Sequence, residues 1–181
     1  MAVLKNTLTL NDALKISSPL RFNMMFKPIG SVCNLDCSYC YYLDKKKMFA
    51  DNSVMPMSLL EKIIKDYIQI NNNEQIVFDW HGGEPLLLGV DYFKKIVDIQ
   101  NKYKCGKYVY NTIQTNATLM NDDFAKFFKD NGFLVGVSID GPQDIHDMYR
   151  KDKDEHPPLI KVMQGIELLH RYDGDFNTLT A

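Results

Sequence analysis

Short apolar runs alternate with longer amphipathic segments along most of this chain. The runs have the length and residue types of buried strands, and in the segments between them apolar residues recur every three or four positions. The runs that we interpret as strands cover residues 22–29, 75–80, 107–114, 133–139 and 176–180. Because strands that alternate with helices usually pair in parallel, the pattern predicts an α/β fold built on one parallel sheet.

Four helices are expected between these strands. In the first, apolar residues from Leu59 to Ile68 lie on one helical face, and Ser58 with Glu61 has the spacing of an N-terminal capping box. The other three are marked by Phe93 with Ile96 and Val97, by Phe124 with Phe127 and Phe128, and by apolar residues from Leu159 to Leu169. No helix follows the last predicted strand, so we expect the sequence to be a fragment of a larger α/β barrel.

Composition and charge exclude several classes of protein. The chain has 181 residues, of which 45% are hydrophobic and 24% charged, as is usual for a globular protein. A formal net charge of −2 predicts no binding to nucleic acid or to an anionic membrane. Charged residues interrupt every apolar run, so neither a transmembrane helix nor a signal peptide is predicted. We therefore expect a cytoplasmic, reducing location.

Three of the four cysteines lie close together, directly after the first predicted strand. Cys33, Cys37 and Cys40 have the spacing C-x3-C-x2-C, which in a reducing compartment favours metal binding over disulfides. Three thiolates can bind three irons of a cubane cluster and leave the fourth iron open. The alternative is a zinc site completed by Cys105 or a histidine, although structural zinc usually takes two separated pairs of ligands. Cys105 itself is expected to be a small buried residue.

The second predicted strand ends at a glycine-rich turn, Gly82-Gly83-Glu84-Pro85. Glycines let a ligand approach the backbone closely, and the carbonyl groups and the Glu84 carboxylate can accept hydrogen bonds from an ammonium group. Alone, such a sequence is more often an ordinary turn. Here it follows the strand next to the cysteine loop, at the edge where α/β barrels carry their active sites. The two motifs together therefore predict one site.

These residues resemble the signature of the radical S-adenosylmethionine (SAM) superfamily. Its cluster motif is matched by the three cysteines with Tyr39 before the last, and its motif for the SAM amino group by residues 82–85. From residue 23 onward the chain is also similar to the anaerobic sulfatase-maturating enzymes. The similar stretches are Lys27-Pro28, Cys40-Tyr41-Tyr42-Leu43, residues 80–86, Gln114-Thr115-Asn116, residues 133–142, His146-Asp147 and Tyr149-Arg150.

The resemblance implies a partial (β/α)6 barrel of the TIM type and a role for each matching residue. Cys33, Cys37 and Cys40 would bind a 4Fe–4S cluster whose open iron takes the amino and carboxylate groups of SAM. The implied SAM-binding residues are Tyr39 and Tyr42 near the adenosine, Gly82, Gly83, Glu84 and Pro85 at the ammonium group, and Ser138 and Arg150 on the ribose and carboxylate side. Gln114 and Asn116 would face a substrate peptide.

The activity implied is the oxidation of a Cys or Ser residue in a sulfatase polypeptide to Cα-formylglycine. One electron, from a flavodoxin- or ferredoxin-type donor, would cleave SAM to a 5′-deoxyadenosyl radical that takes a hydrogen from Cβ of that residue. Residues 1–22 would be an N-terminal extension. Residues 23–181 would be an incomplete radical SAM core without the family's C-terminal auxiliary-cluster domain, and no residue here matches the family's proton-accepting acid.

Two alternatives and one departure accompany this interpretation. The chain could be another peptide-modifying radical SAM enzyme with a SPASM-type C-terminal domain, or a truncated iron–sulfur or zinc protein without turnover. The departure is Ala117, which stands where the family usually has glycine after Gln114-Thr115-Asn116. We expect this change to be tolerated.

Overall fold

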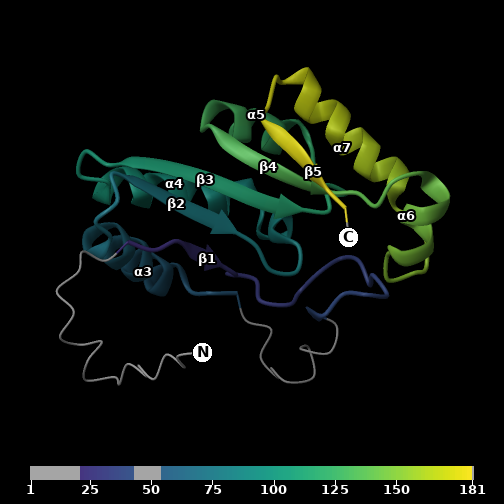
Figure 1. Ribbon diagram of the computed structural model, residues 1–181, viewed down its shortest axis with the longest axis horizontal. Helices are drawn as coiled ribbons and strands as arrows, with labels where there is room; N and C mark the ends of the chain where they lie inside the picture. The colour runs from purple at the N-terminus through teal and green to yellow at the C-terminus, as the bar shows by residue number, and fades with distance from the viewer. Residues whose placement is uncertain (1–20, 43–53, 181) are drawn as a thin grey trace, which may run out of the picture.

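Five parallel strands form a single sheet in the computed structural model, which describes residues 21–42 and 54–180 (Figure 1). They lie side by side in chain order: β1 (Met24–Phe26), β2 (Gln75–Trp80), β3 (Tyr108–Thr115), β4 (Phe133–Ser138) and β5 (Phe176–Leu179). Every neighbouring pair is parallel. The predicted α/β fold is therefore confirmed. The expected N-terminal extension, residues 1–22, lies almost entirely outside the described residues.

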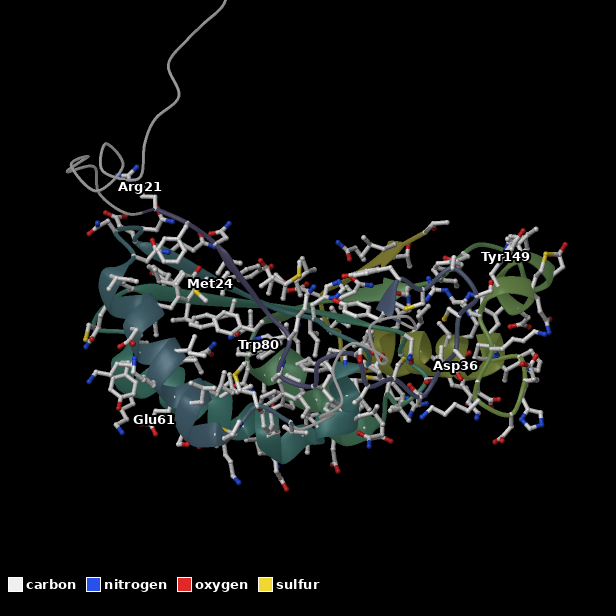
Figure 2. The ribbon with its side chains drawn as sticks, turned by 90° about the horizontal axis from the view of Figure 1, so that it is seen from below. Arg21, Met24, Asp36, Glu61, Trp80 and Tyr149 are labelled. Carbon is white, nitrogen blue, oxygen red and sulfur yellow. The ribbon has the colours of Figure 1, made fainter. Side chains whose placement is uncertain are left out.

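The four predicted helices cover one face of the sheet. They are α3 (Met57–Ile70), α4 (Val90–Tyr103), α5 (Asp122–Asp130) and α7 (Leu159–Arg171), and Figure 2 shows the strands running above them. Two short elements were not predicted, the 3-10 helix η1 (Pro85–Leu88) and α6 (Gln143–Tyr149). The apolar residues Ile145 and Met148 of α6 are 40% and 57% exposed, so this helix has no buried stripe that a periodic pattern could indicate.

The core lies between this face of the sheet and the helices. Ile76, Phe78 and Trp80 alternate inward along β2 and are almost completely buried. The indole N–H of Trp80 donates to Oδ1 of Asn111 at 2.8 Å, and Asn111 exchanges two amide hydrogen bonds with Gln100 of α4. The polar groups below the sheet are thus paired, as buried polar groups require.

The predicted capping box at the start of α3 is wrong. The helix begins at Met57 after Pro56, so Ser58 already lies inside its first turn, and no side chain caps the start. Glu61 instead accepts hydrogen bonds from Lys102 Nζ (2.8 Å) and the Tyr103 hydroxyl (2.9 Å) of α4. The Pro56 carbonyl accepts the hydrogen bond of the first helical turn, from the N–H of Leu60 at 3.0 Å, so Pro56 and not Ser58 occupies the cap position.

The opposite face of the sheet has no helix over it within residues 21–42 and 54–180. A groove of about 240 Å³ runs along it, lined by half-buried side chains that include Asp79 of β2, Thr112 of β3 and Leu134 of β4. The Thr112 hydroxyl donates to Asp79 at 2.7 Å. This partly polar face can therefore line a binding site. Among the described helices, none is both long enough and apolar enough to cross a lipid bilayer.

Helix α7 packs very closely on the segment that follows β3. A Cβ atom placed on Gly165, in the middle of α7, would lie 2.5 Å from the carbonyl oxygen of Ala117. Ala117 has a φ of 57°, in the left-handed region, which gives a physical reason for the glycine usual at this position in the resembling family. The helix can therefore pack against this strained turn only because residue 165 has no side chain.

Gly165→Ala is expected to lower the free energy of unfolding by about 1–3 kcal/mol, because overpacking outweighs the better helix propensity of alanine. The control is Lys161→Ala on the exposed side of the same helix, which should change it by less than about 0.5 kcal/mol. Urea unfolding measures both. An unchanged or raised value for Gly165→Ala would contradict the close packing of α7.

Candidate functional site

The carboxyl ends of the strands surround a cavity of about 220 Å³. The loop after β1, the turn after β2, the ends of β3 and β4 and the residue after α6 all contribute to it. It brings together the predicted site residues Cys33, Cys37, Cys40, Tyr39, Tyr42, Gly82, Gly83, Gln114, Asn116, Ser138 and Arg150. Glu84 and Pro85 do not line it. Residues up to 117 positions apart in the sequence thus meet at the edge that parallel α/β sheets use for binding.

The three clustered thiols are half-buried in the wall of this cavity. Burial raises the pKa of Cys33 to about 11, and burial also raises the pKa of Cys37. A bound cation has the opposite effect, because a metal ion deprotonates the thiols that coordinate it. Cys33 and Cys37 therefore become thiolates most readily when a metal centre coordinates them.

The position of Cys105 bears on the choice between a cluster and zinc. Structural zinc takes four protein ligands, whereas a cubane with one open iron needs only three thiolates. Cys105 is exposed, contrary to our expectation, and it precedes the eight-residue strand β3 at the end remote from the cavity. Cys105 therefore does not complete a zinc site with the loop, and the three thiols at the cavity match a cluster with one open iron.

Backbone hydrogen bonds tie the cysteine loop to the segment after α6. Leu35 and Asp152 form an antiparallel bridge, and the N–H of Asp36 donates to the carbonyl of Lys151 at 2.8 Å. The N–H of Ser38 donates to the carbonyl of Tyr149 at 2.9 Å. Figure 2 shows Asp36 and Tyr149 at the same end of the molecule. One side of the loop is thereby fixed to residues more than a hundred positions later.

A buried ion pair holds Arg150 and Tyr39 at the cavity. Arg150 donates from Nε to Asp140 Oδ2 (2.7 Å) and from an Nη atom to Oδ1 (2.9 Å), and both side chains are almost fully buried. The Tyr39 hydroxyl donates to the same Asp140 Oδ2 at 2.6 Å, and the Arg150 guanidinium carbon lies 5.5 Å from the Tyr39 ring centroid. Burial and the Asp140 hydrogen bond raise the pKa of Tyr39. Arg150 therefore presents a fixed positive charge beside Cys37.

The glycine turn after β2 packs directly against the residues that precede Cys33. The N–H groups of Gly83 and Glu84 donate to the carbonyls of Gly30 (2.8 Å) and Val32 (2.9 Å). A Cβ atom on Gly83 would overlap the Val32 carbonyl group, so no other residue fits without moving this backbone. The glycines thus serve first to join the turn to the cysteine loop, which the sequence motif alone did not indicate.

Glu84 is turned away from the cavity. Its side chain is completely buried, and its oxygens accept hydrogen bonds from the N–H of Leu86 (2.9 Å), the Thr115 hydroxyl (2.7 Å) and the N–H of Asn116 (2.7 Å). Burial raises its pKa to about 7, against these three donors. The Glu84 carboxylate therefore joins the turn after β2 to the end of β3.

Gln114 and His81 line both the cavity and the groove on the open face of the sheet. The Gln114 amide donates to the Ser138 hydroxyl at 2.8 Å, and Gly136 leaves the space that the Gln114 side chain fills. Nδ1 of His81 accepts the N–H of Gly82 at 2.9 Å, and burial lowers the pKa of His81. Gln114 and His81 therefore lie between the cavity and the groove.

Several residues of the site were not predicted. Asp140 was interpreted only as part of a turn, because nothing in its sequence neighbourhood pairs it with Arg150. Nδ1 of His146 accepts the Asp140 N–H at 3.3 Å, while its Nε2 is buried without a partner among the described residues. Asn34 and Thr118 contact Asn116. The predicted residue Tyr42 is buried, and the Lys27 ammonium nitrogen lies 5.1 Å from the centroid of its ring.

The sequence of this chain is similar to a family profile and to several curated proteins. The profile of the Radical SAM superfamily matches residues 28–180. A serine-type anaerobic sulfatase-maturating enzyme of Bacteroides thetaiotaomicron is 48% identical over 87% of this chain and 39% of its own length. A cysteine-type anaerobic sulfatase-maturating enzyme of Clostridium novyi is 41% identical over 88% of this chain and 43% of its own length. The chain thus spans about two fifths of the length of these curated relatives.

Solved structures are similar as well. Native anSMEcpe with bound AdoMet and Cp18Cys peptide superposes with a TM-score of 0.81 and 36% identity, over 89% of this chain and 43% of that one. Native anSMEcpe with bound AdoMet gives a TM-score of 0.80 and 37% identity, over 86% of this chain and 42% of that one. The predicted partial TIM-like barrel is confirmed by these similarities.

Asp140→Ala is expected to lower the free energy of unfolding by about 3–5 kcal/mol, because it leaves the buried Arg150 charge without its partner. The matched control is Lys62→Ala, which breaks an exposed ion pair with Asp66 and should cost less than about 1 kcal/mol. Urea unfolding of both variants measures the difference. Equal small effects would contradict the buried pair.

Proposed function

Because this chain belongs to the radical SAM superfamily, we propose that the loop from Cys33 to Cys40 binds a 4Fe–4S cluster and that the cavity beside it binds SAM. The observation that carries the proposal is the convergence of three thiols from one loop on one cavity. The chemistry of the donors fits, since three thiolates satisfy three irons and leave one open.

The cavity wall offers complementary groups for each part of SAM. Arg150, held by Asp140, supplies a positive charge for the carboxylate, and Ser138 supplies a hydroxyl for the ribose. Tyr39 and Tyr42 offer aromatic surface for the adenine, and the Gly82–Gly83 backbone lies open to the ammonium group. We assign Glu84 and Pro85 to holding that turn, because neither lines the cavity. When bound together, the cluster and SAM supply one-electron chemistry that removes a hydrogen atom from a substrate carbon.

We further propose that the whole protein oxidises a Cys or Ser residue of a sulfatase polypeptide to Cα-formylglycine. Support comes from the names of the relatives, which include serine-type and cysteine-type sulfatase-maturating enzymes. Gln114 lines both the cavity and the groove on the sheet face, so a peptide in the groove would lie next to the cavity. In this assignment the groove orients the peptide so that its Cys or Ser side chain points to the cavity.

The remaining assignments follow from this chemistry. Residues from 23 onward form the radical SAM core, in keeping with the profile match from residue 28. A flavodoxin- or ferredoxin-type protein supplies the electron. The reaction takes place in the cytoplasm, where reducing conditions keep Cys33, Cys37 and Cys40 available as ligands.

A triple variant with Cys33→Ser, Cys37→Ser and Cys40→Ser should lose cluster binding and the formation of 5′-deoxyadenosine. The loss should exceed about 100-fold, since even residues that only contact metal ligands cost 10–100-fold when changed. The measurement is anaerobic reconstitution with iron and sulfide, addition of SAM and dithionite, and chromatography of the product. Cys105→Ser, which changes the exposed cysteine outside the loop, is the matched control and should behave as the wild type.

Sulfatase-derived peptides with Cys or Ser at the target position test the substrate in the same reaction. Conversion to formylglycine changes the peptide mass and supports the proposal. SAM cleavage with both peptides unchanged would sink the sulfatase assignment and favour another peptide substrate. Zinc in place of iron would overturn the assignment of the loop itself.

A further inference from the structure

Asn116, at the end of β3, is fixed by its surroundings on every side. Its side chain is buried, with 7% of the residue exposed, and its backbone N–H donates to Glu84 Oε2 at 2.7 Å. The amide oxygen accepts from both the N–H (3.0 Å) and the hydroxyl (2.7 Å) of Thr118. Its orientation is therefore determined, because a flipped amide would set its NH2 group against the Thr118 N–H.

The amide nitrogen of Asn116 consequently faces the cysteine loop. It donates to Asn34 Oδ1 at 3.0 Å and lies 3.8 Å from the sulfur of Cys33. The Asn34 amide in turn donates to the Thr118 hydroxyl oxygen at 2.8 Å, which closes a ring of three side chains. Two N–H groups on one nitrogen thus have two acceptors, an amide oxygen and a sulfur.

Cys33 differs in this respect from the other two cysteines of the loop. Its sulfur also accepts the backbone N–H of Leu35 at 3.4 Å. Within the described residues, no side-chain amide contacts the sulfur of Cys37 or Cys40. Cys33 is therefore the cysteine of the loop whose sulfur faces a side-chain amide as well as a backbone N–H.

We propose that Asn116 is a positioning residue of the cluster, donating an N–H···S hydrogen bond to the Cys33 thiolate and raising the cluster's reduction potential. The inference rests on the proposed cluster, and it replaces the sequence-based expectation that Asn116 faces the substrate peptide. Reduction adds negative charge that spreads onto the sulfurs, and an N–H dipole aimed at one of them stabilises the reduced form. The same bond fixes the side chain of Cys33 for binding iron.

A redox titration of the reconstituted protein, followed by electron paramagnetic resonance, tests this role. In Asn116→Ala the ratio of reduced to oxidised cluster at a fixed potential should fall about threefold, or about 30 mV at 59 mV per tenfold change. Asn116→Asp keeps the acceptor contacts with Thr118 but replaces the donor with an acceptor, so its fall should be larger. Asn101→Ala removes an exposed asparagine amide that does not line the cavity, and the potential should stay at the wild-type value.

A second measurement detects the contact itself. Wild-type protein labelled with 15N in asparagine side chains should show electron spin echo modulation from a 15N nucleus coupled to the reduced cluster, and Asn116→Ala labelled in the same way should lose it while Asn34 keeps its label. Iron and sulfide analysis separates the outcomes. A wild type that binds no cluster overturns the proposed function and this inference with it. A bound cluster without 15N coupling, and with the same potential in all four proteins, overturns the role of Asn116 alone.

Discussion

The whole site depends on one backbone contact, the packing of the Gly82–Gly83 turn against residues 30–32. Two N–H groups of the turn donate to carbonyls just before Cys33, and the Val32 carbonyl occupies the space that a side chain on Gly83 would need. This contact joins the end of β2 to the start of the cysteine loop. The bridge between Leu35 and Asp152 then fixes the loop from its other side. The turn after β2 and the segment after α6 thus both hold the cysteine loop through backbone hydrogen bonds. These bonds keep the three thiols at one cavity without a bound ligand.

Two buried carboxylates organise the groups that face this cavity without lining it themselves. Glu84 holds the end of β3 through Thr115 and Asn116, and Asp140 holds Arg150 and Tyr39. The wall that remains consists of thiols, amides, hydroxyls, aromatic rings and one guanidinium group. Such a wall attracts anions and donates hydrogen bonds, so it suits the carboxylate of SAM and the sulfurs of a cluster. Glu84 and Asp140 therefore position the residues of the wall through buried hydrogen bonds.

The periodic pattern was sufficient to predict the parallel sheet and its four covering helices. Each of these helices has a buried stripe, and each strand is a short apolar run. Helix α6 buries little more than His146 and was missed for that reason. The cysteines, the glycine turn and Arg150 were found from motifs whose residues stand close in sequence or match a known family. Asp140, Asn34 and Thr118 were not, because their partners are 10 to 84 positions away and only the fold brings them together. The capping box of α3 was wrong because the helix starts earlier, with Pro56 rather than Ser58 at the cap position.

The central claim is that three protein thiolates hold a cluster with one iron left open to SAM. Mössbauer spectroscopy of protein reconstituted with 57Fe, recorded with and without SAM, tests it most directly. The account predicts four irons, of which one changes its signal on addition of SAM while three do not. Four irons that all ignore SAM, or a site that takes zinc in place of iron, would contradict it.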